Sequence, residues 1–212
     1  MKNLKVGACD WGLPGGGLYA VRIAYETGIE ALSLKLGLYE NDYPLTYAEM
    51  QKIYKAEQQK YGIEYCAIAL NDFDNIPMHA RRGTKEYKIV WDMLMRAVPT
   101  ANALGVKMIQ VPAFTASEIK TEEDMEHSSW AFQYLCDQAG EYGIDVASEN
   151  CMSPEEFKKF YEMVDRDNFY LYYDSQNYKL NKDYDQVEIL EELYPYFCDQ
   201  LHVKDGNGAL SR

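Results

Sequence analysis

The sequence predicts an α/β fold built from parallel strand–helix units, and a recurring junction carries this prediction. A helical stretch ends at a glycine that is followed by a β-branched and a charged residue, in Thr27–Glu30, Tyr61–Glu64, Leu104–Lys107 and Tyr142–Asp145. A glycine just past a helix can adopt the left-handed conformation that terminates it, and the β-branched residue then starts a strand. Each interval between these glycines holds one strand and one helix, which favours parallel βα units.

Short, nearly continuous apolar runs mark seven strands, as expected when both faces of a sheet are covered. We expect strands at Lys5–Trp11, Ile29–Leu34, Ile63–Leu70, Val106–Pro112, Asp145–Asn150, Phe169–Asp174 and Gln200–Lys204. We expect helices at Gly17–Thr27, Thr46–Tyr61, Thr84–Leu104, Thr121–Tyr142, Ser153–Val164 and Tyr184–Tyr196. The side chains of Thr46, Thr84, Thr121 and Ser153 are candidate N-terminal caps of four of these helices.

Two architectures are compatible with these units: a doubly wound open sheet, and a (β/α)₈ barrel that lacks its last unit. An open sheet favours a GxGxxG turn after its first strand, but Gly12, Gly15, Gly16 and Gly17 follow at a different spacing. This glycine-rich loop is therefore only a weak indication of a phosphate cradle. No linker divides the chain, so we expect residues 1–212 to form a single domain.

Composition excludes several classes of protein. A hydrophobic content of 47% excludes global disorder, and no run of 18 apolar residues is present to span a membrane. The N-terminal residues show no signal-peptide pattern, and the five cysteines form no CxxC pair. We therefore expect a cytoplasmic protein with reduced cysteines.

The net charge of −13 argues against nucleic-acid binding, because a polyanion would be repelled. The only compact basic cluster consists of His79, Arg81, Arg82 and Lys85. It is too small to neutralise the many phosphates of a nucleic-acid groove.

Three successive strands end in residues that can bind a metal. Glu149 and Asn150 are the last residues of the fifth expected strand, Asp174 ends the sixth, and His202 lies on the seventh. Carboxylates and imidazole suit manganese, magnesium, cobalt or zinc, which polarise carbonyl oxygens as Lewis acids. Taken singly, Glu149 is equally compatible with a loop hydrogen bond, Asp174 with a turn, and His202 with the core. Their positions at consecutive strand ends favour a shared metal site.

These strand ends resemble a known family. The runs Ala147–Asn150, Tyr172–Asn177 and Leu201–Asp205 are similar, in order and spacing, to those of the xylose isomerase-like sugar phosphate isomerases and epimerases. Asn71 and the Ala103–Val106 junction extend the resemblance over essentially the whole chain. The resemblance implies a TIM (β/α)₈-type barrel with about seven βα units and with the last strand and helix missing.

The resemblance also implies one divalent cation at the carboxyl-end rim, manganese first, with magnesium, cobalt or zinc as alternatives. Three of its usual ligands match Glu149, Asp174 and His202, whereas the fourth, a glutamate after an eighth strand, has no counterpart up to Arg212. Family members often carry a histidine three residues after the aspartate, where this chain has Asn177. The implied reaction is sugar or sugar phosphate isomerisation or epimerisation through an enediolate, with Glu149 as the catalytic group.

The substrate would be a small sugar, and four residues are candidates for contacting it: Trp11, Asn177, Lys204 and Asp205. Arg81 and Arg82 are weaker candidates for contacting a phosphate or carboxylate. Family members often form homo-oligomers, so the resemblance makes a homo-oligomer possible here, and the sequence leaves the oligomeric state open.

Other functions remain open from the sequence. The chain could be a non-catalytic sugar- or polyol-binding protein or an inactive truncated barrel, because the fourth ligand is absent from it. An inositol-pathway dehydratase or isomerase is another candidate on the same barrel. An AP-endonuclease-like enzyme is disfavoured, because those enzymes use several more histidines than the three present here and must approach DNA.

Overall fold

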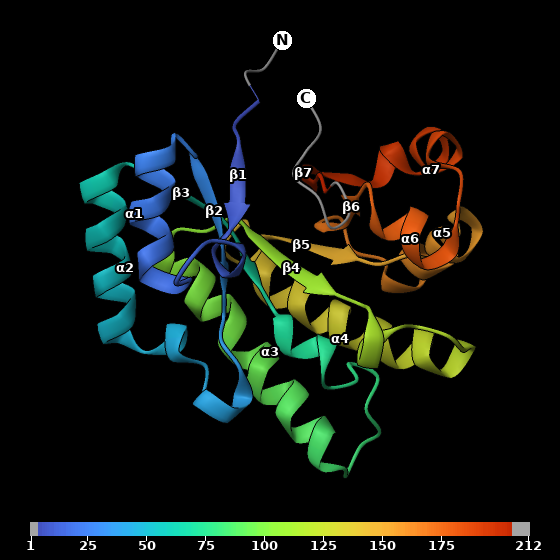
Figure 1. The fold of residues 1–212 in the computed structure, drawn as a ribbon. Helices are drawn as coiled ribbons and strands as arrows, with labels where there is room; N and C mark the ends of the chain where they lie inside the picture. Colours follow the sequence, from blue (N-terminus) through green and yellow to red (C-terminus); the bar gives the residue numbers. More distant parts are fainter. Residues whose placement is uncertain (1–3, 205–212) are drawn as a thin grey trace.

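The computed structural model describes residues 4–204 and contains seven parallel strands in one curved sheet (Figure 1). The strands are β1 (Gly7–Cys9), β2 (Ala31–Lys35), β3 (Glu64–Ala69), β4 (Met108–Pro112), β5 (Asp145–Glu149), β6 (Phe169–Asp174) and β7 (Phe197–His202). They lie side by side in chain order. A doubly wound sheet would reverse its strand order at a switch point. The prediction of a TIM-barrel-type fold is therefore confirmed, and the open-sheet alternative is wrong.

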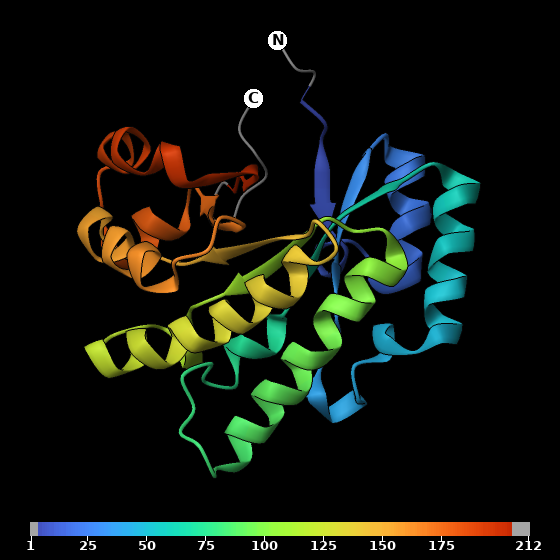
Figure 2. The same cartoon turned by 180° about the vertical axis from the view of Figure 1, so that it is seen from behind.

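The helices cover the outer face of the sheet (Figures 1 and 2). They are α1 (Gly17–Thr27), α2 (Ala48–Tyr61), α3 (Lys85–Leu104), α4 (Glu122–Gly140), α5 (Pro154–Val164), α6 (Asn177–Lys182) and α7 (Gln186–Leu193). Within residues 4–204, none of them combines the length and the apolar character that a membrane crossing requires.

The recurring glycines end the helices as the sequence predicts. Gly28, Gly62 and Gly105 are the C-caps of α1, α2 and α3, with φ angles of 77°, 69° and 72°. Gly143 also has a positive φ of 58°, but α4 ends three residues earlier, at Gly140. The predicted extension of this helix to Tyr142 is therefore wrong.

Three of the four predicted caps are confirmed. Thr84, Thr121 and Ser153 each accept a backbone hydrogen bond at the start of α3, α4 and α5, and the last two form reciprocal capping boxes. Thr46 does not cap α2: its hydroxyl donates to the Tyr43 carbonyl oxygen, and the helix begins two residues later. Thr46 instead ends a short 3₁₀ turn that starts at Pro44.

The main core lies between the sheet and its helices. Leucine, isoleucine and valine side chains of the strands, such as Leu34, Ile109 and Leu171, pack there against the helices. A second, smaller cluster contains Ala67, Met108, Ala147 and Tyr172. Because side chains alternate along a strand, this cluster shares its face with the polar residues two positions further on, Gln110, Glu149 and Asp174. The inner face of the sheet is therefore apolar in the middle of these strands and polar at their carboxyl ends.

Several predicted boundaries need correction near the chain ends. The first strand is shorter than expected, because the 3₁₀ helix η1 (Asp10–Gly12) begins directly after Cys9. The last strand begins earlier than expected, at Phe197, after a 3₁₀ turn over Tyr194–Tyr196 that ends α7. Helix α6 was not expected at all.

Candidate active site

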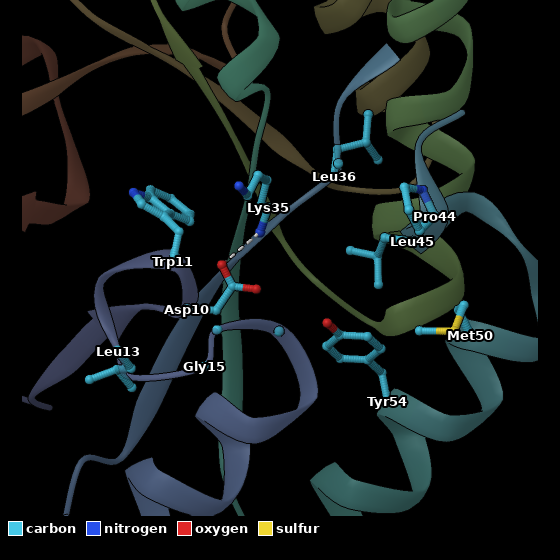
Figure 3. A pocket seen from close by; sticks show the side chains of 13 residues that line it. Asp10, Trp11, Leu13, Gly15, Lys35, Leu36, Pro44, Leu45, Met50 and Tyr54 are labelled. Atoms are coloured by element: carbon cyan, nitrogen blue, oxygen red, sulfur yellow. Dashed lines mark hydrogen bonds between the residues drawn. The ribbon is translucent and has the colours of Figure 1, made fainter. Parts of the chain in front are cut away.

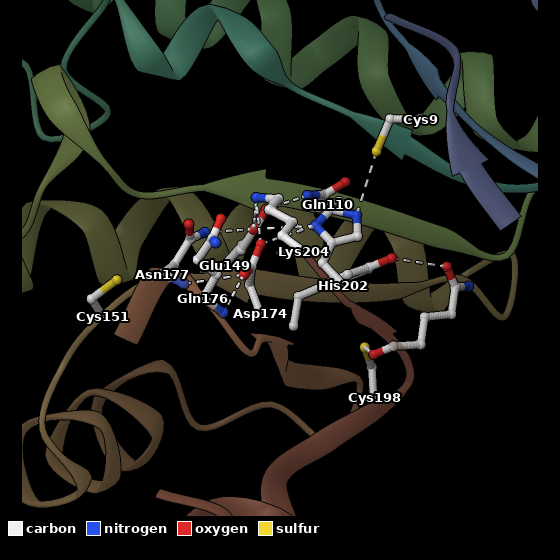
Figure 4. A network of polar contacts seen from close by, with 12 residues as sticks. Cys9, Gln110, Glu149, Cys151, Asp174, Gln176, Asn177, Cys198, His202 and Lys204 are labelled. Atoms are coloured by element: carbon white, nitrogen blue, oxygen red, sulfur yellow. Dashed lines mark hydrogen bonds and ion pairs between the residues drawn. The ribbon is translucent and has the colours of Figure 1, made fainter. Parts of the chain in front are cut away.

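The three predicted metal ligands converge at the carboxyl ends of β5, β6 and β7 (Figure 4). Each of Glu149, Asp174 and His202 offers one ligand atom, and these atoms all lie within 4.8 Å of one another. His202 Nδ1 lies 3.2 Å from Glu149 Oε1 and 3.7 Å from Asp174 Oδ2. The two carboxylates are only 4% and 1% exposed, so this is a buried cluster of negative charge with an imidazole beside it.

The carboxylate of Glu149 is held on both oxygens. Gln110 Nε2 on β4 donates to Oε2, while Asn177 Nδ2 at the start of α6 donates to Oε1 at 3.0 Å. In the sheet register, Pro112 pairs with Glu149 and Gln110 with Ala147, so the Gln110 side chain reaches diagonally toward the rim. The orientation of Glu149 is therefore set by residues of two different units.

The carboxylate of Asp174 is held by backbone and by charge. Its Oδ1 accepts the N–H groups of Gln176 and Asn177, at 2.9 and 3.1 Å, and its Oδ2 forms an ion pair with Lys204 Nζ. Burial alone would raise the pKa of Asp174, but His202 and Lys204 lower it well below its usual range. Asp174 is therefore ionised at neutral pH.

The imidazole of His202 is fixed from both sides. Its Nδ1 faces the carboxylates, its Nε2 lies 3.6 Å from Cys9 Sγ, and its ring lies against Tyr172 with centroids 4.7 Å apart. Burial opposes protonation, but the contacts with Asp174, Cys9 and Glu149 raise the pKa of His202 to about 11. The cluster thus attracts positive charge strongly, as a cation site must.

The residues predicted to contact the substrate do not all lie at the cluster of Glu149, Asp174 and His202. Lys204 Nζ lies 3.9 Å from Glu149 Oε1 as well as at Asp174, and Asn177 contacts both acids, so the structure brings these two into the cluster. Arg81 is paired with Glu123 at 2.8 Å on the exposed surface. Asp205 lies outside the described residues.

Trp11 belongs to a neighbouring cavity rather than to the cluster itself (Figure 3). This cavity of about 490 Å³ lies where β1 and β2 end, and the glycine-rich loop forms part of its wall. Its lining includes Asp10, whose Oδ1 accepts a hydrogen bond from the backbone N–H of Lys35 at 3.3 Å. Burial raises the pKa of Asp10 to about 6, although the hydrogen bond and the charge of Lys35 oppose this.

Three residues of the rim are not predicted from the sequence as site residues: Cys9, Asp10 and Gln110. Gln110 carries a readable signal, since it is a lone amide within the buried apolar strand Met108–Pro112. Cys9 carries no such signal, because its contact with His202 spans 193 residues of sequence.

Known proteins similar to this chain include sugar epimerases. A 2-epi-5-epi-valiolone 7-phosphate 2-epimerase of Actinoplanes sp. is 28% identical over 202 residues, which cover 95% of this chain and 73% of that protein. Among solved structures, D-allulose 3-epimerase from Methylomonas sp. in complex with D-allulose has a TM-score of 0.73 at 18% identity, covering 99% of this chain and 77% of that one. The IOLI protein with a bound zinc atom has a TM-score of 0.75 at 19% identity, covering 97% and 74%.

A match to a family profile identifies the family of this chain. The profile of the xylose isomerase-like TIM barrel matches residues 21–212, which include every strand from β2 onward and all three residues of the cluster. The match agrees with the observed strand order and with the similar barrels among solved structures. The chain belongs to the xylose isomerase-like TIM barrel family.

Proposed function

We propose that this protein is a divalent-metal-dependent isomerase or epimerase of a small sugar. The observation that carries the proposal is the cluster of Glu149, Asp174 and His202, whose ligand atoms lie within 4.8 Å of one another at three adjacent strand ends. Active sites of this barrel are built at that rim. The similar Actinoplanes enzyme, named as a 2-epimerase, supports the same class of reaction.

The donor set fits a divalent cation. Two carboxylates and one imidazole nitrogen, in the unprotonated form that a metal requires, suit manganese first, with magnesium, cobalt or zinc as alternatives. Asp174 would bind through Oδ2, His202 through Nδ1 and Glu149 through Oε1, since these atoms face one another. When bound, the cation supplies Lewis-acid polarisation of the substrate carbonyl and stabilises negative charge on its oxygens.

Proton transfer falls to Glu149. In an epimerisation or an aldose–ketose isomerisation, a base removes the proton on the carbon beside the carbonyl, leaving an enediolate, and reprotonation gives the product. Gln110 and Asn177 hold the carboxylate of Glu149 in one orientation for this step. The ammonium group of Lys204, beside both acids, is placed to donate a hydrogen bond to a substrate oxygen.

Hydrogen exchange with solvent tests the proposal directly. The Mn²⁺-loaded protein is incubated in D₂O with a panel of free and phosphorylated ketoses, and deuterium beside the carbonyl is followed by proton NMR. We expect incorporation for at least one ketose, together with a new epimer or aldose. Calorimetry on the same panel resolves the opposite case, since sugar binding without exchange would contradict an enzyme and indicate a sugar-binding protein.

A further inference from the structure

The cavity at the carboxyl ends of β1 and β2 (Figure 3) lies at the same rim of the sheet as the cluster of Glu149, Asp174 and His202. Asp10 is one of the residues that line this cavity. The residue before it, Cys9, contacts the cluster, because its Sγ lies 3.6 Å from His202 Nε2. We infer that this cavity takes the uncharged, hydroxyl-bearing end of the sugar, and that Asp10 recognises it. This inference rests on the proposed function and deepens it, because it names a non-phosphorylated sugar as the substrate class.

Among the described residues, the backbone N–H groups of Lys35 and Trp11 use only part of the hydrogen-bonding capacity of the Asp10 carboxylate. The residue is only 3% exposed, yet it lines the cavity. Oδ1 accepts the backbone N–H of Lys35, and Figure 3 shows the other oxygen directed across the cavity toward Tyr54. Each carboxylate oxygen has two lone pairs, so room remains for sugar hydroxyl donors.

The other walls suit the rest of a polyol. The side chain of Lys35 lines the cavity and supplies a donor for hydroxyl oxygens, while Trp11, 36% exposed, offers an aromatic face to C–H groups. Leu36, Leu45 and Met50 add apolar surface. A few placed polar groups on a largely apolar and aromatic wall are typical of small-molecule sites.

The glycine-rich loop keeps this space open. Gly16 and Gly17 have φ angles of +58° and +52°, a region that side chains disfavour. A Cβ on Gly17 would lie 3.4 Å from the Tyr54 hydroxyl oxygen, so a larger residue would fill the cavity from this side. The loop therefore lines the cavity with backbone atoms, and no side chain of these glycines occupies the cavity.

The charge of Asp10 decides between a hydroxyl group and a phosphate. A glycine loop beside a lysine is compatible with phosphate when taken alone. A buried carboxylate in the same wall would face the phosphate dianion at low effective dielectric, where like charges repel strongly. The carboxylate accepts hydrogen bonds from hydroxyl groups with no such repulsion, so the cavity favours a free sugar over its phosphate ester.

Calorimetric titrations with matched ligands test this inference. D-Fructose and D-xylulose, and the terminal phosphate ester of each, are titrated in Mn²⁺ into wild type, Asp10→Asn, Trp11→Leu and Asp167→Asn. We expect wild type to bind a free ketose at least about tenfold more tightly than its ester, and Asp10→Asn and Trp11→Leu to weaken that binding about tenfold. Asp10→Asn should also reduce the preference over the ester. Asp167, an exposed turn residue, is the control and should change nothing.

Three results would overturn the inference: tighter binding of the esters, unchanged free-sugar binding in both cavity variants, or no binding of either member of any pair. Circular dichroism verifies folding, and Trp11→Leu keeps the test decisive if Asp10→Asn does not fold. Titration of Mn²⁺ without sugar distinguishes a failure of the proposed metal-dependent function from a failure of the inference about the cavity. Mn²⁺ binding without the sugar preference contradicts only this inference, whereas an Asp10-dependent preference without Mn²⁺ binding contradicts the metal-dependent function.

Discussion

Gln110 on β4 donates a hydrogen bond from its side-chain amide to Glu149 Oε2 on the neighbouring strand β5. This contact is buried, and it orients the one carboxylate that serves as both proposed ligand and proposed base. Residues that hold a metal ligand in place from behind typically change metal affinity about 10–100-fold when replaced.

Gln110→Met should therefore weaken Mn²⁺ binding about 10–100-fold with the fold intact, because the methionine has a similar volume but donates no hydrogen bond. Calorimetric titration measures the dissociation constant. Gln133→Met is the matched control, since Gln133 donates to the Met163 carbonyl oxygen on the helical layer. Equal Mn²⁺ affinity in wild type and Gln110→Met would mean that the contact does not position Glu149.

Glu149→Gln should lower turnover at least about 100-fold, the range for loss of a general base, and leave the circular dichroism spectrum unchanged. Deuterium incorporation into the ketose should fall in parallel. Glu155→Gln, an exposed change in the first turn of α5, provides the comparison. Normal activity in Glu149→Gln would show that another group carries the proton.

Metal removal should lower the stability of the wild-type protein. With Mn²⁺ at about 100 times its dissociation constant, binding to the native state adds about 2.7 kcal/mol to the free energy of unfolding. For a chain of this size, the melting temperature should then fall about 5–10 °C on chelation. Asp174→Asn should reduce this difference strongly, because it removes the buried charge of a proposed ligand. An equal fall in melting temperature in wild type and Asp174→Asn would mean that the ion binds elsewhere.

The free energy of unfolding should depend on pH because the pKa of Asp10 is raised in the native protein. Its pKa is about 6 in the native protein and 3.8 as a model value, so the native state binds the proton more tightly. The resulting stabilisation is full below about pH 4 and is lost as the pH rises through 6. Relative to Asp10→Asn, wild type should lose about 1.4 kcal/mol of unfolding free energy between pH 5 and 7.5. Urea unfolding at the two pH values measures this, and a constant difference would refute it.

Local signals predicted most of the fold. The positive-φ glycines and the capping residues Thr84, Thr121 and Ser153 act within a few residues of themselves, so the sequence reports them faithfully. Helix α6 is different, because it is only six residues long and Asp174 Oδ1 accepts the N–H groups that precede and begin it. Its formation depends on where β6 ends, which periodicity does not reveal.

The sequence predicts the convergence of the three candidate ligands, but not the residues that hold them in place. Strand ends place Glu149, Asp174 and His202 at one rim whatever the exact register. The partnership of Gln110 with Glu149 depends on the register of β4 against β5, where Gln110 pairs with Ala147. The Cys9–His202 contact depends on how far the sheet curves, and no local pattern encodes that curvature.

The strict neighbour-to-neighbour strand order has a consequence for folding. Each strand pairs only with its sequence neighbours within residues 4–204, so the sheet can grow one unit at a time as the chain is synthesised. Some side-chain contacts join strands that are not neighbours, among them Cys9 with His202, Glu149 with His202, and the Gln200 side-chain amide with the Cys66 carbonyl oxygen at 2.9 Å. All three require β7, and β7 also brings His202, the last of the three candidate ligands along the chain. The three candidate ligands therefore come together late in folding, and an ion bound as proposed would report the pairing of β7 rather than nucleate the sheet.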